Sequence, residues 1–222
     1  ISAINSDYGT IEGTRVADNE AGFIETGNVD VGAYAIGLTY ARELTDNFKI
    51  GGNVKYAHQH LGSNIYEAGG ESSKNLESGL VYDIGTRFYT GFKSHAIGIT
   101  IQNFSTQWKY EEITFDLPLT FTIGTSMNIM DFVEGHDNPL MLSVDAIHPR
   151  GYNEQIQVGG EYLFRNLIAF RTGYKFNYDE QGLSVGLGVR PRVSGIDMKI
   201  DYSYNDFGVF DAVHRFSIGI GY

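Results

Sequence analysis

The chain ends in the stretch Val213-His214-Arg215-Phe216-Ser217-Ile218-Gly219-Ile220-Gly221-Tyr222. In this stretch, large apolar side chains alternate with small or polar ones: Phe216, Ile218 and Ile220 share one parity, and Arg215 and Ser217 share the other. Successive side chains of a β-strand point to opposite faces, so the stretch predicts a strand with one apolar and one polar face. A last strand that ends on an aromatic residue is typical of outer-membrane barrels, which touch lipid on one face only.

The same alternation recurs in the segments 31–40, 49–56, 80–88, 168–175 and 196–204. Within each segment the charged residues share one parity, as Arg171 and Lys175 do. A charge at mid-bilayer depth costs several kcal/mol, so the charged parity is predicted to face the interior of a barrel. A soluble β-sandwich would bury the apolar parity instead. Periodicity by itself therefore does not decide whether the apolar face contacts lipid or a protein core.

Composition favours one large all-β domain, which we expect to span residues 1–222. The 222 residues include 28 Gly, 15 Tyr and 14 Phe, 4 Pro and no Cys, with a net charge of −11. Glycine and aromatic residues at this level suit curved strands with aromatic girdles. The acidic balance argues against nucleic-acid partners. Because Ile1 opens inside a predicted strand, we expect the domain to be N-terminally incomplete.

Turn signals and periodicity predict about twelve strands, at 1–15, 30–43, 48–61, 78–89, 94–104, 117–129, 139–147, 154–164, 167–176, 182–190, 196–205 and 213–222. Long connections at 16–29, 62–77, 105–116 and 206–212 alternate with tight ones at 44–47, 90–93, 165–166 and 191–195. Long loops outside and short turns inside are typical of outer-membrane barrels. The connection 130–138 fits this pattern least well, because it is long for an inner turn.

The stretch 26–55, TGNVDVGAYAIGLTYARELTDNFKIGGNVK, resembles the PorV/PorQ group of outer-membrane barrels, which belongs to the FadL-like class. Seven shorter pieces resemble the group in the same order: 116–121 (DLPLTF), 144–149 (VDAIHP), 160–162 (GEY), 171–175 (RTGYK), 182–188 (GLSVGLG), 200–204 (IDYSY) and 214–217 (HRFS). The group's N-terminal segment, with an Asn-Pro-Ala-like motif and the first strands, has no counterpart here. The resemblance implies a transmembrane antiparallel barrel of fourteen strands, about two of which precede Ile1.

The resemblance implies two different functions. PorV-like members act in the type IX secretion system, where the barrel binds cargo proteins and passes them to the machinery that attaches them to the cell surface. FadL-like members instead carry hydrophobic small molecules across the outer membrane. We take the secretion role as the prediction and transport as the alternative. Either role places the chain in the outer membrane of a Gram-negative-type cell, with lipid as one partner and, for the first role, secretion-machinery or cargo proteins as others.

The charged parity supplies the candidate site residues, which are predicted to line the lumen: Asp83, Arg87, Asp145, Glu161, Arg171, Lys175, Arg190, Asp197, Lys199, Asp201 and Arg215. They form either a selectivity lining for a solute or a packed network of ion pairs. Both signs are mixed and many neighbours are glycine, which favours the packed network. Because the last two strands follow each other in sequence, we expect Arg215 to contact a carboxylate at Asp197 or Asp201.

Aromatic residues in the long loops are candidate anchors for a protein partner, namely Tyr66, Trp108 and Tyr110. The competing interpretation is that Trp108 and Tyr110 belong only to the outer aromatic girdle. We expect no enzymatic activity, cofactor or metal. The six histidines lack zinc-ligand spacing, and no Gly-x-Ser-x-Gly motif occurs.

Overall fold

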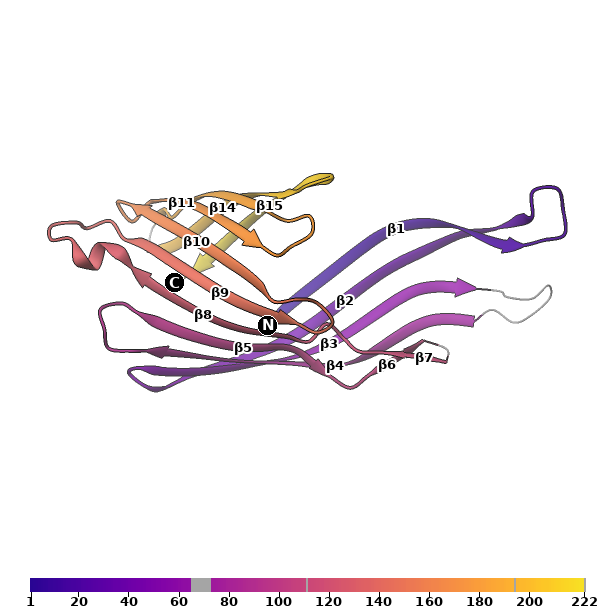
Figure 1. The fold of residues 1–222 in the computed structure, drawn as a ribbon, viewed down its shortest axis with the longest axis horizontal. Coiled ribbons are helices and arrows are strands. Elements are labelled where there is room, and N and C mark those ends of the chain that lie inside the picture. Colours follow the sequence, from indigo (N-terminus) through magenta and orange to yellow (C-terminus); the bar gives the residue numbers. More distant parts are fainter. Residues whose placement is uncertain (65–72, 111, 194, 222) are drawn as a thin grey trace. The chain divides into compact units, whose positions relative to one another are not determined.

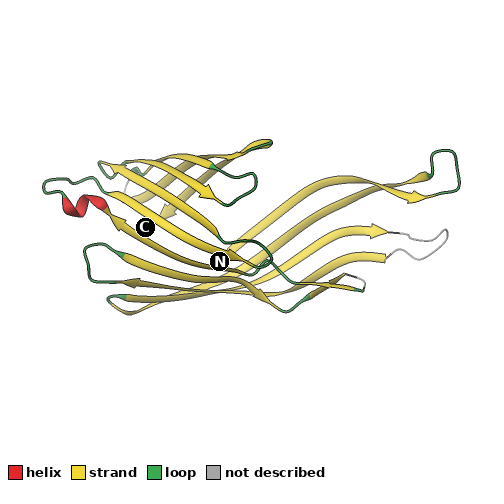
Figure 2. Cartoon of the chain, viewed as in Figure 1, coloured by secondary structure: helices red, strands yellow, loops and turns green. Residues whose placement is uncertain are grey.

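The computed structural model describes residues 1–64, 73–110, 112–193 and 195–221. Within these ranges the chain is almost entirely β-strand, with one short 3-10 helix, η1 (Ile129–Phe132) (Figure 2). No helix in the described part of the chain is long and apolar enough to cross a membrane. The prediction of an all-β chain is confirmed.

Thirteen strands form one large antiparallel sheet (Figure 1). Its order is β1-β2-β3-β4-β5-β8-β9-β10-β11-β12-β14, with β13 and β15 both paired to β14. The strand bounds are β1 Ser2–Val16, β2 Phe23–Thr45, β3 Phe48–Asn64, β4 Ser73–Tyr89, β5 Ala96–Ser105, β8 Thr120–Asn128, β9 Leu140–Pro149, β10 Gln155–Phe164, β11 Ile168–Phe176, β12 Leu183–Val189, β13 Arg192–Val193, β14 Ile196–Phe207 and β15 Phe210–Gly221. All twelve predicted strands are present in this sheet, which also contains the short strand β13 that was not predicted. Strand β1 is at one end of this order, and β13 and β15 both pair with β14 at the other end.

The chain divides into two compact units, and the division runs across strands β2 to β5. Unit 1 comprises residues 1–42, 51–84 and 102–119, and unit 2 comprises residues 43–50, 85–101 and 120–222. Unit 2 contains strands β8 to β15 and the tight turns at 44–47 and 90–93. Unit 1 contains the long parts of β1 to β4 and a separate two-stranded sheet of β6 (Trp108–Tyr110) and β7 (Ile113–Phe115).

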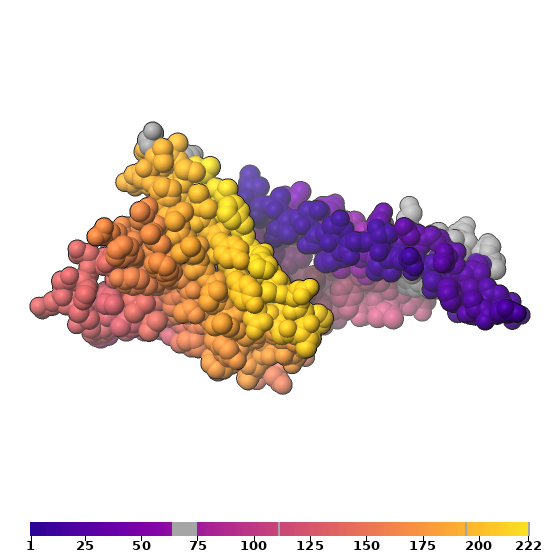
Figure 3. Space-filling model, turned by 90° about the horizontal axis from the view of Figure 1, so that it is seen from above, coloured from indigo at the N-terminus to yellow at the C-terminus, as the bar shows by residue number. Residues whose placement is uncertain are grey.

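Strands of unit 2 show the predicted alternation in three dimensions. On β11, Phe170 and Tyr174 are 50% and 48% exposed, whereas the Arg171 side chain between them is only 32% exposed. On β15 both parities are exposed: Phe216 and Ile218 are 66% and 60% exposed, and Arg215 and Ser217 are exposed as well; Figure 3 shows this C-terminal strand, in yellow, at the surface. Among the described residues only five apolar side chains are buried: Val81, Ala96, Trp108, Leu163 and Ala169. On strands such as β11, the apolar parity is therefore the more exposed one.

Unit 1 contains strands that are much longer than predicted. The expected loop 16–29 is wrong, because β1 runs to Val16 and β2 starts at Phe23, with thirteen residue pairs between the two strands. The large apolar residues in this part, Val16, Phe23, Ile24 and Val29, do not recur at every second position, so the apolar period that marks a strand is absent from the sequence. Backbone pairing extends the hairpin, and the register shifts between Asp7 and Thr10, beside Gly9 with a φ of 80°.

Three other connections differ from expectation. Segment 206–212 is a tight turn, because Phe207 pairs with Phe210 and Gly208 adopts a positive φ of 57°. Segment 105–116 contains the β6–β7 hairpin, with Trp108 opposite Phe115. Segment 62–77 is shortened by β3 and β4, and its residues 65–72 lie outside the described ranges.

The unusual connection 130–138 is held by a local hydrogen-bond network in unit 2. The Asn128 side chain caps η1 by accepting from the backbone N–H of Met130 at 3.2 Å, and it also accepts from that of Leu140 at 2.9 Å. Asp131 accepts from the backbone N–H of Ser94 at 3.0 Å and from Asn128 Nδ2 at 2.7 Å. These hydrogen bonds join η1 to the neighbouring turn 90–95, which explains why the long connection 130–138 is tolerated.

Candidate binding cavity on the polar face

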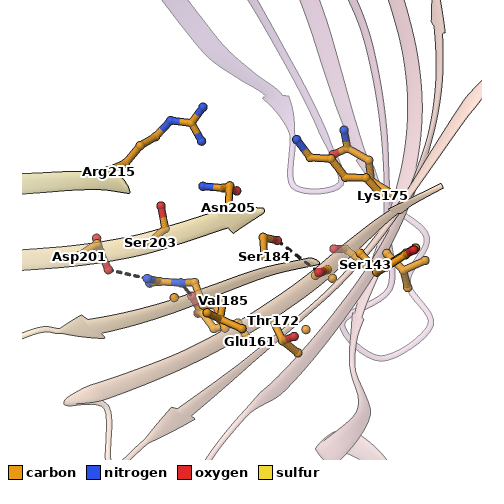
Figure 4. Close-up of a pocket in the computed structure, with 18 of the residues that line it drawn as sticks. Ser143, Glu161, Thr172, Lys175, Ser184, Val185, Asp201, Ser203, Asn205 and Arg215 are labelled. Carbon is orange, nitrogen blue, oxygen red and sulfur yellow. Dashed lines mark hydrogen bonds and ion pairs between the residues drawn. The ribbon is translucent and has the colours of Figure 1, made fainter. Parts of the chain in front are cut away.

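Unit 2 has a cavity of about 900 Å³ on the polar face of its sheet (Figure 4). The cavity is lined from strands β9, β10, β11, β12, β14 and β15. Twelve of the 24 lining residues are polar or charged and have the parity that the sequence assigned to an interior: Ser143, Asp145, Gln157, Glu161, Arg171, Lys175, Ser184, Asp201, Ser203, Asn205, Arg215 and Ser217. Antiparallel register brings these side chains to one face, because residues opposite each other on paired strands point the same way.

The centre of the polar face is a chain of ion pairs through Arg171. Its Nε donates to Glu161 Oε2 at 2.5 Å, and its Nη1 donates to Asp201 Oδ1 at 2.6 Å. Arg190 Nη2 donates to Glu161 Oε1 at 3.0 Å. The four side chains are only 27–32% exposed, so the two arginines offset the desolvation of the two carboxylates.

A glycine on β12 makes the ion pair between Arg171 and Asp201 geometrically feasible. Glu161 stands directly opposite Arg171 on β10, but Asp201 is two strands away, with β12 between. A Cβ added at Gly188 would lie 3.0 Å from Arg171 Nη1 and would also overlap the Asp201 carboxylate. The absence of a side chain at Gly188 therefore leaves room for Arg171 to reach across β12.

Two further predicted charges, Asp197 and Asp83, pair with Arg192 and Lys55. Asp197 is bound by Arg192, which stands opposite it on β13 and donates from Nε at 2.5 Å and from Nη2 at 2.9 Å. In unit 1, Asp83 lies 2.9 Å from Lys55 Nζ. The Asp83 carboxylate also accepts from Asn53 Nδ2 at 3.1 Å and from the backbone N–H of Asn103 at 2.9 Å. Asn103 has a positive φ of 61°, which no sequence pattern indicated.

The remaining five candidates make no ion pair with any residue in the described ranges: Arg87, Asp145, Lys175, Lys199 and Arg215. The expectation that Arg215 contacts Asp197 or Asp201 is wrong. Register places Ser203 opposite Arg215 and Ser217 opposite Asp201, and both carboxylates already have arginine partners.

Asp145 lies between the large cavity and a second one of about 400 Å³. The smaller cavity is also in unit 2, and Arg87 lines it together with several threonines of β4, β5 and β8. The Asp145 carboxylate is turned toward β8, where a Cβ at Gly124 would overlap it. Gly124 stands directly opposite Asp145 in register, so this side chain occupies the space that the glycine leaves.

The predicted loop anchors occupy different environments in unit 1. Trp108 is only 4% exposed and contacts Phe115 edge-on at a centroid distance of 6.2 Å. Tyr110 stacks on Phe115 at 5.2 Å and donates to Gln59 Oε1 at 3.0 Å. Burial raises the pKa of the Tyr110 phenol, and the negative charge of Glu77 adds to the effect. In this conformation Trp108 offers little surface to a partner; Tyr66 lies outside the described residues, and the anchor role stays a prediction.

The described part of the chain has no cluster of metal ligands. No three His, Cys, Asp or Glu side chains gather there in a way that would hold a metal ion. His95 is hydrogen-bonded to Thr90 and Thr125 at 3.0 and 2.7 Å, and His214 is hydrogen-bonded to Tyr202 at 2.7 Å. The arrangement as a whole offers charged and hydroxyl groups to a ligand.

No protein-family model matches this chain, and no curated protein matches it significantly. The PorV/PorQ resemblance therefore stays a prediction from the residues that carry it.

Proposed function

We propose that the chain forms an outer-membrane β-barrel that binds partner proteins in a secretion and surface-attachment system of the PorV/PorQ type. The observation that carries the membrane part of this proposal is the distribution of side chains in unit 2. Large apolar residues such as Phe170 and Ile218 are half exposed or more, while charged residues line a cavity. A soluble sandwich has the opposite arrangement, because it buries its apolar face against a second layer.

Strand lengths support the same proposal. A tilted strand needs about 9–11 residues to cross the hydrocarbon core. Strands β8, β9, β10 and β11 have 9, 10, 10 and 9 residues. Strand β2 has 23 residues, and its exposed apolar residues Tyr34, Ile36, Leu38, Tyr40 and Leu44 lie in its second half. About half of β2 then lies beyond the membrane, which agrees with the polar residues Glu25, Thr26, Asn28 and Asp30 near its start.

The partner-binding part of the proposal is supported by the long polar hairpins and by the PorV/PorQ resemblance. Hairpin β1–β2 has apolar side chains near its tip, with Val16 88% and Phe23 47% exposed. A paired, extended hairpin loses little conformational freedom on binding, so it is a suitable docking element for a folded protein. The cavity of unit 2 is lined by charged and hydroxyl side chains together with apolar ones such as Met141 and Val185, so it leaves the alternative of a conduit for hydrophobic solutes open.

The test uses a strain that lacks the gene, complemented with the full chain or with a shortened hairpin. Removing Thr14–Val16 together with Phe23–Glu25 deletes three cross-strand pairs and retains the turn 17–22. We expect this variant to insert normally and to lose secretion of cargo while uptake of a hydrophobic solute is unchanged. Lost uptake with normal secretion would establish the FadL-like alternative instead. If the gene deletion itself changes neither process, both roles are wrong.

A further inference from the structure

We propose that the large cavity of unit 2 binds a phosphate-type dianion between Lys175 on β11 and Arg215 on β15. Both cations line this cavity, and Figure 4 shows their side chains extending over it from opposite sides. The proposal concerns unit 2 alone. It goes beyond the proposed secretion role and does not depend on it.

Neither cation has a carboxylate partner in the described part of the chain. Lys175 Nζ donates to the neutral Gln181 Oε1 and lies 5.3 Å from the ring centre of Tyr178. Arg215 makes no ion pair there, and it is close enough for its charge to act on Lys175. Two uncompensated cations that repel each other over one cavity are stabilised by an anion placed between them.

Carboxylates on the same face do not compensate these two cations. Glu161 and Asp201 are held by Arg171, and Glu161 also by Arg190. Asp145 is level with Lys175, because both are opposite Gln157 in register, yet its carboxylate is turned toward Gly124 on the far side of β9. The anions of the cavity are therefore already paired or directed away from the proposed site.

Neutral hydrogen-bonding groups lie between the two cations. Ser184 on β12 is directly opposite Asn205 on β14, and Ser203 is opposite Arg215. All three line the cavity, and Asn205 Nδ2 has no hydrogen-bond partner in the described residues. A lysine and an arginine with hydroxyl and amide groups between them match a tetrahedral dianion, which presents several acceptor oxygens, better than a single carboxylate.

The experiment is titration calorimetry on the full chain in detergent micelles, at neutral pH and low ionic strength, with inorganic phosphate as the probe and acetate as the monoanionic comparison. We expect phosphate to bind, and acetate to bind at least about tenfold more weakly, since a charge-assisted hydrogen bond contributes about 1.5–3 kcal/mol. Lys175→Gln and Arg215→Gln should each weaken phosphate binding by about tenfold or more.

Three variants serve as controls. Lys199→Gln removes a cation from the same face of β14 that does not line the cavity, and it should leave phosphate binding unchanged. Lys175→Arg retains the charge and should retain binding, which distinguishes a lost site from a lost fold. Asp145→Asn removes the unpaired anion and should tighten phosphate binding about twofold, because Asp145 repels the ligand over roughly 10 Å.

Absence of phosphate binding by the full chain would overturn the proposal. Weakening by Lys199→Gln as large as that by Lys175→Gln would also overturn it, because binding would then reflect general charge. Acetate binding as tight as phosphate binding would show that the ligand is not a dianion.

Discussion

Unit 1 and unit 2 are built by the same antiparallel pairing but distribute their side chains differently. On β11 of unit 2, exposed Phe170 and Tyr174 alternate with half-buried Arg171 and Lys175. On β1 of unit 1 nearly every residue is exposed, including Ile4 at 63% and other residues of both parities. A sheet with two distinct faces can separate an apolar from a polar environment, whereas a hairpin with two similar faces is suited to water. Under the membrane proposal, this comparison places the membrane-crossing segments in unit 2 and in the central parts of β2–β4.

The largest expected effect distinguishes these two surfaces directly. Phe170→Arg places a cation on the outward face of β11, where it should reduce the stability of the inserted protein by about 2–4 kcal/mol if that face contacts lipid. Ile11→Arg introduces the same side chain at a 56% exposed position of β1 and should change stability by less than about 0.5 kcal/mol. The measurement is denaturant unfolding from lipid vesicles. Equal effects of the two substitutions would remove the distinction between the units.

A smaller effect comes from the ion pairs, which we compare at Arg171 in unit 2 and at Lys55 in unit 1. Arg171→Gln in unit 2 leaves Asp201 without its arginine, and we expect a loss of about 2 kcal/mol in the free energy of unfolding. Lys55→Gln in unit 1 leaves Asp83 with Asn53 and the Asn103 N–H, so about 1 kcal/mol is expected. Chemical denaturation in micelles measures both. A larger loss for Lys55→Gln than for Arg171→Gln would show that the hydrogen bonds from Asn53 and Asn103 do not stabilise the Asp83 carboxylate once Lys55 is removed.

The smallest effect is local and depends on pH. Hydrogen bonds from Ser94, first from its side chain and then from its backbone, hold the pKa of Asp131 below its ordinary range. Ionised Asp131 therefore stabilises the folded turn at neutral pH. This contribution is lost as the pH falls below the ordinary range of an aspartate and through the lowered pKa. We expect faster amide exchange at Ser94, relative to other turns, only under acidic conditions. Asp131→Asn should remove the pH dependence; if it persists in that variant, another group is responsible.

Sequence periodicity predicted strand identity well wherever one face is apolar. Segment 168–175 is the clearest case, since its charged parity lines the cavity as predicted. Prediction failed in 16–29 because the apolar residues there do not recur at every second position, so pairing of the two backbones decides the structure and produces no pattern in either strand alone. The turn at 208–209 was missed because Gly208 and a Phe207–Phe210 pair specify it without the usual cluster of turn residues.

Which charges share a face could be predicted, but which charges form pairs could not. Arg171 binds Asp201 across β12 because Gly188 leaves space, and that depends on the register of three strands. Arg215 was assigned to the adjacent strand by sequence order, but register places Ser203 opposite it. A displacement of a single pair along β14 changes every such contact, and a sequence pattern with a period of two residues does not contain that information.

The central claim is that the apolar face of unit 2 contacts lipid hydrocarbon, and site-directed spin labelling tests it most directly. The chain contains no cysteine, so single substitutions from Ala169→Cys to Lys175→Cys give one unique label each along β11. In bilayers, the account predicts that labels at 170, 172 and 174 are relaxed by lipid-soluble oxygen and shielded from a water-soluble nickel chelate. Labels at 169, 171, 173 and 175 should not share that signature. Equal access of the nickel chelate to positions 170, 172 and 174 would contradict the claim.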